Sequence, residues 1–195
     1  AVSGGTAPLT YSWDTVTTNT TLNASGLAVG IYRLTVTDAT GCQKVQQVTI
    51  TEPAAIVITT NLEKDITCFG DSDGAIKITV SGGTPVYSYS WTKNGIPYSV
   101  IKDLSGLSPG TYEVTVSDAN NCGPKKAIYV ITQPAVLKVS LVNQTNILCF
   151  GVATGNINVN VVGGRTSVLG YRFAWTGPNG FTSTTQNLGS VFAGK

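Results

Sequence analysis

An internal repeat is the feature that most restricts how this chain can fold. The motif Ser-Gly-Gly-Thr at residues 3–6 returns at residues 81–84, an offset of 78 residues. The segment Gly-Ile-Tyr-Arg-Leu-Thr-Val-Thr-Asp at 30–38 returns at 110–118 as Gly-Thr-Tyr-Glu-Val-Thr-Val-Ser-Asp, an offset of 80. Because tandem repeats are copies of one structural unit, the fold of that unit decides the architecture of the chain.

Prolines mark the boundaries between the repeats. Boundaries at Pro53 and Pro134 give a first repeat at residues 1–53 that lacks its opening strand. A complete repeat follows at 54–134, and a third repeat at 135–195 lacks its last strands. The junctions contain proline and no flexible Gly/Ser run, so we expect stiff joints. The chain has no methionine, and we expect it to be an internal stretch of a longer array.

Alternation of apolar and polar residues predicts strands within the complete repeat. Ile76, Ile78 and Val80 alternate with polar residues, as do Tyr112, Val114 and Val116. Further strands are expected at 57–60, 86–92, 98–104 and 127–132, between Gly-, Asn- and Asp-rich turns. Six or seven short strands in about 80 residues predict an all-β fold of tandem immunoglobulin-like β-sandwich repeats.

Two aromatic residues of the complete repeat have expected positions. The segment at 107–112 is typical of the corner before strand F of such sandwiches, so the Tyr112 hydroxyl should bond to upstream backbone. Trp91 is expected in the core, because its strand belongs to an inner sheet. The alternative for Trp91 is an exposed ring that stacks on sugar.

The composition excludes several classes of function. The chain has no histidine, no G-x-S-x-G motif and no phosphate-binding loop, so we expect no catalytic residue, no cofactor and no enzyme. Its 12 Lys and Arg residues are scattered, which gives nucleic acid no basic stripe to bind. No apolar run approaches the ~18 residues of a membrane span, so no direct membrane insertion is expected.

Acidic turns are the candidates for a metal site. Asp71 and Asp73 lie in the loop Asp-Ser-Asp-Gly, which could offer oxygen ligands to Ca²⁺. The matching loop at 152–155 has no carboxylate, so a plain turn is favoured and calcium is the weaker hypothesis. Asp38 and Asp118 begin turns, where a side-chain bond to nearby backbone is the ordinary role.

The cysteines recur with the period, Cys42 as Cys122 and Cys68 as Cys149. A disulfide Cys68–Cys122 is expected, since closing its 54-residue span could contribute roughly 4 kcal/mol to a marginal domain. Cys42 and Cys149 would then pair outside this stretch. The competing pairs are Cys42–Cys68 and Cys122–Cys149, across the junctions. Both schemes indicate an oxidising compartment. Metal binding by cysteine is disfavoured, because there is no Cys-x-x-Cys pair.

Three motifs together carry a family resemblance. They are Cys-Phe-Gly-x-x-x-Gly-x-Ile at 68–76, Ser-Gly-Gly-Thr-Pro-x-Tyr-x-Tyr-x-Trp at 81–91, and Gly-Leu-x-Pro-Gly-Thr-Tyr-x-Val-Thr-Val-x-Asp-Ala-x-x-Cys at 106–122. In this order they resemble the SprB repeat of very large surface adhesins of Bacteroidetes. The resemblance covers residues 54–134 and the partial repeats as far as they extend.

The resemblance implies a location and partners. It implies export by the type IX secretion system, display on the cell outer surface, and movement by the gliding machinery. Secreted proteins of these bacteria are O-glycosylated at Asp-Ser/Thr followed by a small or aliphatic residue. The segment Asp14-Thr15-Val16 fits, so Thr15 is a candidate glycosylation site.

The sequence therefore favours a structural role, as a stalk or spacer of a surface adhesin whose nearest partners are neighbouring repeats of the same chain. The alternatives are a carbohydrate-binding module, in which exposed Tyr87, Tyr98 or Tyr129 contacts surface polysaccharide, and an accessory array beside a secreted enzyme.

Overall fold

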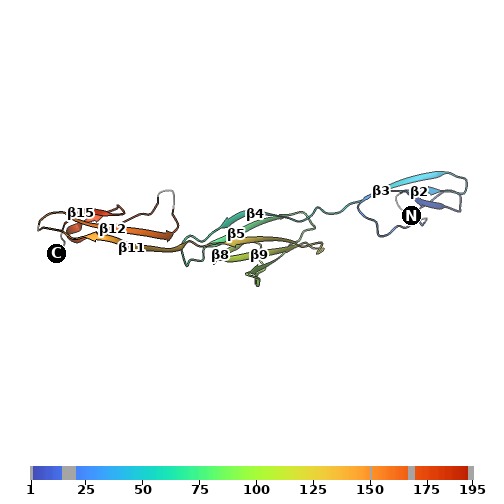
Figure 1. The fold of residues 1–195 in the computed structure, drawn as a ribbon. Coiled ribbons are helices and arrows are strands. Elements are labelled where there is room, and N and C mark those ends of the chain that lie inside the picture. Colours follow the sequence, from blue (N-terminus) through green and yellow to red (C-terminus); the bar gives the residue numbers. More distant parts are fainter. Residues whose placement is uncertain (1, 15–20, 150, 167–169, 193–195) are drawn as a thin grey trace. The chain divides into compact units, whose positions relative to one another are not determined.

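A computed structural model describes residues 2–14, 21–149, 151–166 and 170–192. The chain divides into two compact units, Ala1–Ala55 and Ile56–Lys195. The fold is all-β, as predicted, with one short 3₁₀ turn, η1 (Pro178–Gly180), among the described residues (Figure 1). Over the same residues, no helix is long and apolar enough to cross a membrane.

The described residues of the first unit form a three-stranded antiparallel sheet. Its strands are β1 (Thr10–Trp13), β2 (Gly30–Thr37) and β3 (Gln43–Ile50), in the order β1-β2-β3. Trp13 of β1 lies opposite Leu34 of β2, and Tyr32 of β2 is buried.

The complete repeat forms a sandwich of two antiparallel sheets. One sheet has the order β4-β5-β8, with β4 (Val57–Lys64), β5 (Gly74–Ser81) and β8 (Leu104–Leu107). The other has the order β10-β9-β6-β7, with β6 (Ser88–Lys93), β7 (Ile96–Ser99), β9 (Gly110–Ser117) and β10 (Lys125–Ile131). Seven strands in two sheets confirm the predicted immunoglobulin-like sandwich.

The core of the complete repeat lies between these sheets. The alternation that predicted β5 and β9 places Ile76, Ile78, Val114 and Val116 inside, each at 1% exposure or less, while Lys77 is exposed. Burying such side chains on both inner faces is the main favourable contribution to the stability of a sandwich. Trp91 belongs to the same cluster, which confirms its predicted core position.

One strand prediction was wrong. The expected strand at 98–104 is two strands, because β7 pairs with β6 and β8 pairs with β5, in different sheets. The intervening residues cross from one sheet to the other and leave Val100 and Ile101 exposed. Asp103, directly before β8, stabilises the start of this strand by accepting a hydrogen bond from the Ile78 amide of β5 at 3.0 Å.

The third repeat contains counterparts of the early strands only. Its sheet has the order β11-β12-β15, with β11 (Ala135–Thr145), β12 (Gly155–Gly164) and β15 (Leu188–Val191). A hairpin joins β13 (Trp175–Thr176) to β14 (Thr182–Ser183). Within the described residues, no strand takes the places of β9 and β10.

Candidate functional site

A tyrosine corner recurs in the first and complete repeats. The Tyr112 hydroxyl donates to the Ser108 carbonyl at 2.8 Å, and the Tyr32 hydroxyl donates to the Ala28 carbonyl at 2.9 Å. The predicted corner is therefore confirmed. Burial raises the pKa of the Tyr112 hydroxyl, which keeps it protonated as a donor.

A second recurring feature is an aspartate at one end of each of these repeats. The Asp118 carboxylate accepts backbone N–H bonds from Thr84 at 2.9 Å and from Asn120 and Cys122 at 3.1 Å. Asp38 accepts the equivalent bonds from Thr6, Thr40 and Cys42, at 3.1, 2.9 and 3.0 Å.

These hydrogen bonds stabilise the charged form of the Asp38 and Asp118 carboxyl groups. The pKa of Asp38 falls to about 2, chiefly because the Thr40 hydroxyl donates to it. The pKa of Asp118 is also lowered, with the Thr84 amide as the largest cause. The predicted turn role is confirmed, and the bond to Thr84 also joins two loops that are distant in sequence.

The candidate calcium ligands have different surroundings. Asp73 binds the Lys64 ammonium at 2.8 Å and the Thr67 hydroxyl at 2.6 Å. The Lys64 bond is the main reason why the pKa of Asp73 lies well below its usual range. The Asp73 carboxylate is thus already paired with a lysine ammonium. No group of three Asp, Glu, Cys or His side chains in the described part of the chain could hold a metal ion.

The third repeat keeps the same loop contact without a carboxylate. The Thr67 amide donates to Asp73 at 2.9 Å, and at the matching position the Leu148 amide donates to the Thr154 hydroxyl at 3.1 Å. What recurs at this position is an oxygen acceptor for a backbone amide, which favours the turn over the metal site.

The aromatic side chains separate into core and surface. Tyr129, expected as an exposed aromatic, is 4% exposed and packs 5.8 Å from the Trp91 ring, so that expectation was wrong. β10 turns Tyr129 inward because its alternation buries Tyr129 and Ile131 together. Tyr87 is half-buried and donates to the Gly82 carbonyl at 2.5 Å. Tyr98 is 45% exposed.

All four cysteines are exposed and unpaired in the structure. Cys68 follows β4 at the end of the repeat where β10 finishes, since the Gly70 amide donates to the Gln133 side chain at 3.1 Å. Cys122 lies in the turn between β9 and β10, at the opposite end. The fold therefore does not bring Cys68 and Cys122 together. The seven residues of β10 separate their ends by roughly 23 Å, and a disulfide needs Cα atoms within about 7 Å.

The competing pair Cys122–Cys149 is separated further still. Cys149 follows β11, which starts at Ala135 and leads away from the end of β10. Thr15, the candidate glycosylation site, lies outside the described residues, and its modification stays a prediction.

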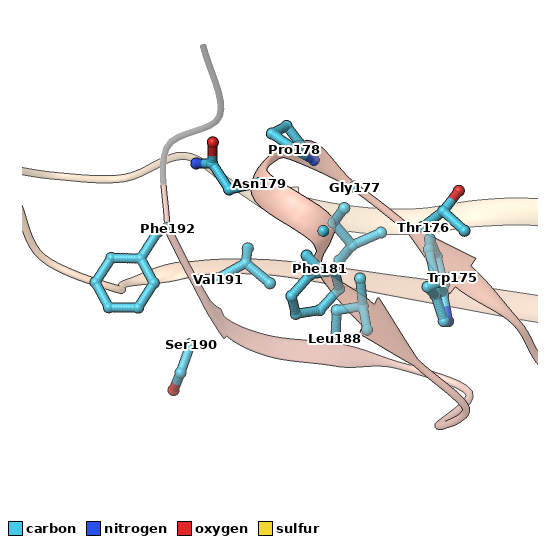
Figure 2. A pocket seen from close by; sticks show the side chains of 12 residues that line it. Trp175, Thr176, Gly177, Pro178, Asn179, Phe181, Leu188, Ser190, Val191 and Phe192 are labelled. Carbon is cyan, nitrogen blue, oxygen red and sulfur yellow. The ribbon is translucent and has the colours of Figure 1, made fainter.

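The third repeat contains an apolar hollow of about 680 Å³. Figure 2 shows Trp175 at one end of it and Phe192 at the other, with Phe181 and Leu188 between them. Trp175 and Leu188 match Trp91 and Leu104 of the complete repeat, because each tryptophan donates to a carbonyl three residues before the matching leucine. In the complete repeat, Trp91 and Leu104 belong to a core cluster that also contains side chains of β9 and β10. The hollow therefore has the position of an incomplete core.

Known proteins resemble this chain in sequence and in fold. The family model of the SprB repeat matches residues 61–95 and residues 141–180. The SprB repeat is thus detected at two places in the chain. The first match contains Cys68, Asp73 and Trp91, and the second contains Cys149, Thr154 and Trp175. The two SprB matches share the core tryptophan and differ at the acidic loop position.

A decoration protein of Escherichia phage T5 is 33% identical to the chain over 85 residues, which are 36% of this chain and 50% of that protein. The chain thus matches half of the length of this curated relative. Three N-terminal domains of the highly immunogenic outer capsid protein Hoc of bacteriophage RB49 superpose with a TM-score of 0.54. That alignment covers 93% of this chain and 70% of the three-domain Hoc chain, at 16% identity, and shows a shared fold.

Sequence reasoning missed one contact between the complete repeat and the third repeat. The Arg165 guanidinium of the third repeat donates to the Ile66 carbonyl of the complete repeat at 3.2 Å. No motif signals it, because the segment around Arg165 is where the third repeat departs most from the pattern of the other two.

Proposed function

We propose that this chain is a structural spacer of a large cell-surface adhesin. One observation carries the proposal: apart from the exposed cysteines, the residues that recur between repeats lie in the core, the tyrosine corner and the aspartate turn. These are positions that fix a fold. The chemically suggestive Asp73 is bound to Lys64 and Thr67, and its counterpart is Thr154.

The comparisons support an exposed, surface-type module. The SprB matches suggest an adhesin repeat, and the names of the two phage proteins describe a capsid decoration and an outer capsid protein. On our proposal the repeats belong to a filament on the cell outer surface. The filament is exported by the type IX secretion system and coupled to gliding, with neighbouring repeats as its direct partners.

A second candidate function, polysaccharide binding, is favoured by one exposed patch. Tyr98 lies beside the exposed Ile96 on β7, and exposed Val100 follows it. An aromatic ring flanked by apolar side chains is a surface on which a sugar can stack.

Single-molecule stretching of the whole chain, tethered at both ends, separates the two functions. A spacer should resist force through the complete repeat, which should unfold in one step. That step should release on the order of 25 nm of chain, from about 3.5 Å per residue. Extension without such a step would overturn the proposal. Glycan-array binding that Tyr98→Ala abolishes and Tyr89→Ala leaves intact would move the function to polysaccharide recognition.

A further inference from the structure

The cysteines of this chain occupy two positions in the repeat. Cys68 and Cys149 lie in the opening loop, after the first strand, whereas Cys42 and Cys122 lie in the turn before the last strand. All four are exposed. Because the opening loop and the turn lie at opposite ends of the complete repeat, Cys68 and Cys122 cannot pair with each other, and a disulfide partner for either would have to come from another repeat.

The joint between the complete repeat and the third repeat shows what Cys68 faces. Cys68 and Phe69 line a hollow of about 620 Å³ together with Gly164, Arg165 and Thr166 of the third repeat. The Arg165 bond to the Ile66 carbonyl holds this loop against the end of the complete repeat. The opening cysteine of one repeat thus lies beside the Gly-Gly loop of the next.

The complete repeat shows what packs on that loop. Gly83 and Thr84 are the counterparts of Gly164 and Arg165. The Thr84 amide donates to Asp118 at 2.9 Å, and the Ala119 amide donates to the Thr84 carbonyl at 3.0 Å. Asp118 in turn accepts a bond from the Cys122 amide. The turn cysteine is therefore anchored beside the Gly-Gly loop of its own repeat.

The first repeat has the same arrangement. The Ala39 amide donates to the Thr6 carbonyl at 2.9 Å, and Asp38 accepts bonds from the amides of Thr6 and Cys42. Two independent copies of the turn thus place their cysteine next to the loop that, in the third repeat, lines the same hollow as Cys68.

We propose that the opening cysteine of the complete repeat forms a disulfide with the turn cysteine of the repeat that follows it, so that the joint between these two repeats is closed covalently. The proposal goes beyond the spacer function and does not depend on it. At the joint described above, the two thiols are Cys68 and the turn cysteine of a third repeat completed like the second. The 195-residue sequence reaches Lys195 before that turn.

The oxidation needs a small-molecule disulfide such as oxidised glutathione. One cysteine thiolate attacks it, forms a mixed disulfide and releases one glutathione thiolate. The second cysteine thiolate then attacks the protein sulfur of the mixed disulfide and releases the other glutathione. Two cysteine protons are lost, and two electrons reduce one glutathione disulfide to two thiols.

The test uses the whole chain, extended after Lys195 by a copy of residues 112–134, which supplies the missing turn. Peptide mapping without reduction, after incubation with oxidised and reduced glutathione, should find Cys68 linked to the added turn cysteine. Cys68→Ser should abolish this link, while the matched variant Cys149→Ser should leave it intact. A Cys68–Cys122 link, or a free Cys68 thiol in the folded extended chain, would overturn the proposal.

A second variant decides the matter if the extension does not fold. Thr166→Cys in the original chain places a thiol on the loop that shares the hollow with Cys68 and keeps the Arg165 bond to the Ile66 carbonyl. The proposal predicts a disulfide between Cys68 and position 166 in the same buffer, whereas a thiol introduced by Lys138→Cys should not react with Cys68. Failure of position 166 to link would show that the joint does not present Cys68 to the next repeat, and would overturn the proposal.

Discussion

At the scale of single residues, Asp118 shows how one side chain can organise the end of a repeat. Its carboxylate is 5% exposed and accepts three backbone N–H bonds from two loops. Charge-assisted bonds of this kind are stronger than bonds between neutral groups. They also make the end of the repeat sensitive to acid, because a protonated carboxyl accepts these bonds poorly.

Acid should therefore destabilise the fold in a defined window. The folded-state pKa values of Asp38, Asp73 and Asp118 are lowered, so their contribution to stability is complete above the unfolded value of 3.8. This contribution to stability is lost as the pH falls below 3.8 and through the folded-state pKa, which is about 2 for Asp38. Denaturant unfolding of Asp118→Asn should show lower stability at pH 7 and a weaker fall between pH 4 and 2 than the unaltered chain.

Asp71→Asn is the matched control, since the structure shows no hydrogen bond to the Asp71 carboxylate. This variant should keep the pH dependence of the unaltered chain. Identical acid profiles for Asp118→Asn and the unaltered chain would contradict the structural role of the aspartate.

The tyrosine corner gives a second prediction at this scale. Tyr112→Phe keeps the buried ring and removes the bond to the Ser108 carbonyl, so it should lower the free energy of unfolding by about 1 kcal/mol. Tyr89→Phe, whose hydroxyl makes no bond shown in the structure, should change stability little. The measurement is urea unfolding followed by tryptophan fluorescence, and equal midpoints for both variants would count against the corner.

At the scale of strands, β5 and β8 approach closely at Gly74. A Cβ at this position would lie 2.8 Å from the Ile131 side chain and 2.9 Å from the Leu107 carbonyl oxygen. A Cβ at Gly155, the matching residue of the third repeat, would lie 2.8 Å from the Val191 side chain and 3.1 Å from the Val191 carbonyl oxygen. The glycine recurs because the inner space of the sandwich leaves no room for a methyl group.

Gly74→Ala should therefore destabilise the complete repeat by about 1–3 kcal/mol, the usual cost of overpacking. Gly189→Ala is the matched strand control, since an added methyl there meets nothing within 4 Å. Thermal unfolding of the two variants gives the comparison. A Gly74→Ala chain as stable as the Gly189→Ala chain would show that the sheets can separate at low cost.

The strands also show why the sequence predicted the core and not the cysteine partners. Alternation fixes which residues of β5 and β9 face inward, and that prediction was confirmed. The cysteine pairing depends on how many strands run between Cys68 and Cys122. Four predicted strands would put both at one end of the sandwich, but the structure has five, β5 to β9, and an odd number puts them at opposite ends.

The miscount came from residues 98–104, where an apolar run continues through the crossing between sheets. Periodicity carries no signal for a chain that changes sheet without changing its alternation of side chains. The same limit applies to Tyr129. Its aromatic character allowed both a surface and a core position, and only the packing of β10 against Trp91 decides between them.

At the scale of the whole molecule, the repeats differ in how complete their cores are. The complete repeat buries Trp91, Tyr112 and Leu107 between two sheets. The third repeat has the hollow beside Trp175 in the corresponding place. Local stability follows the density of buried contacts.

Hydrogen exchange should reveal this difference. Amides of β5, β6 and β9 should be protected for longer than those of β12 and β15, because the latter strands border the hollow. The measurement is exchange of the intact chain followed by mass spectrometry of its peptides. Equal protection in the two repeats would mean that β12 and β15 are stable without counterparts of β9 and β10.

The central claim is that this chain acts as a spacer, and length is the property that tests it most directly. Chains with one, two and three additional copies of residues 54–134, inserted at the Pro134 junction, would be compared by small-angle X-ray scattering. The account predicts that the maximum dimension grows by a constant step of roughly 30 Å per copy, about one eight-residue strand and its joint. Steps that shrink with each copy, as expected for a chain with flexible linkers, would contradict it.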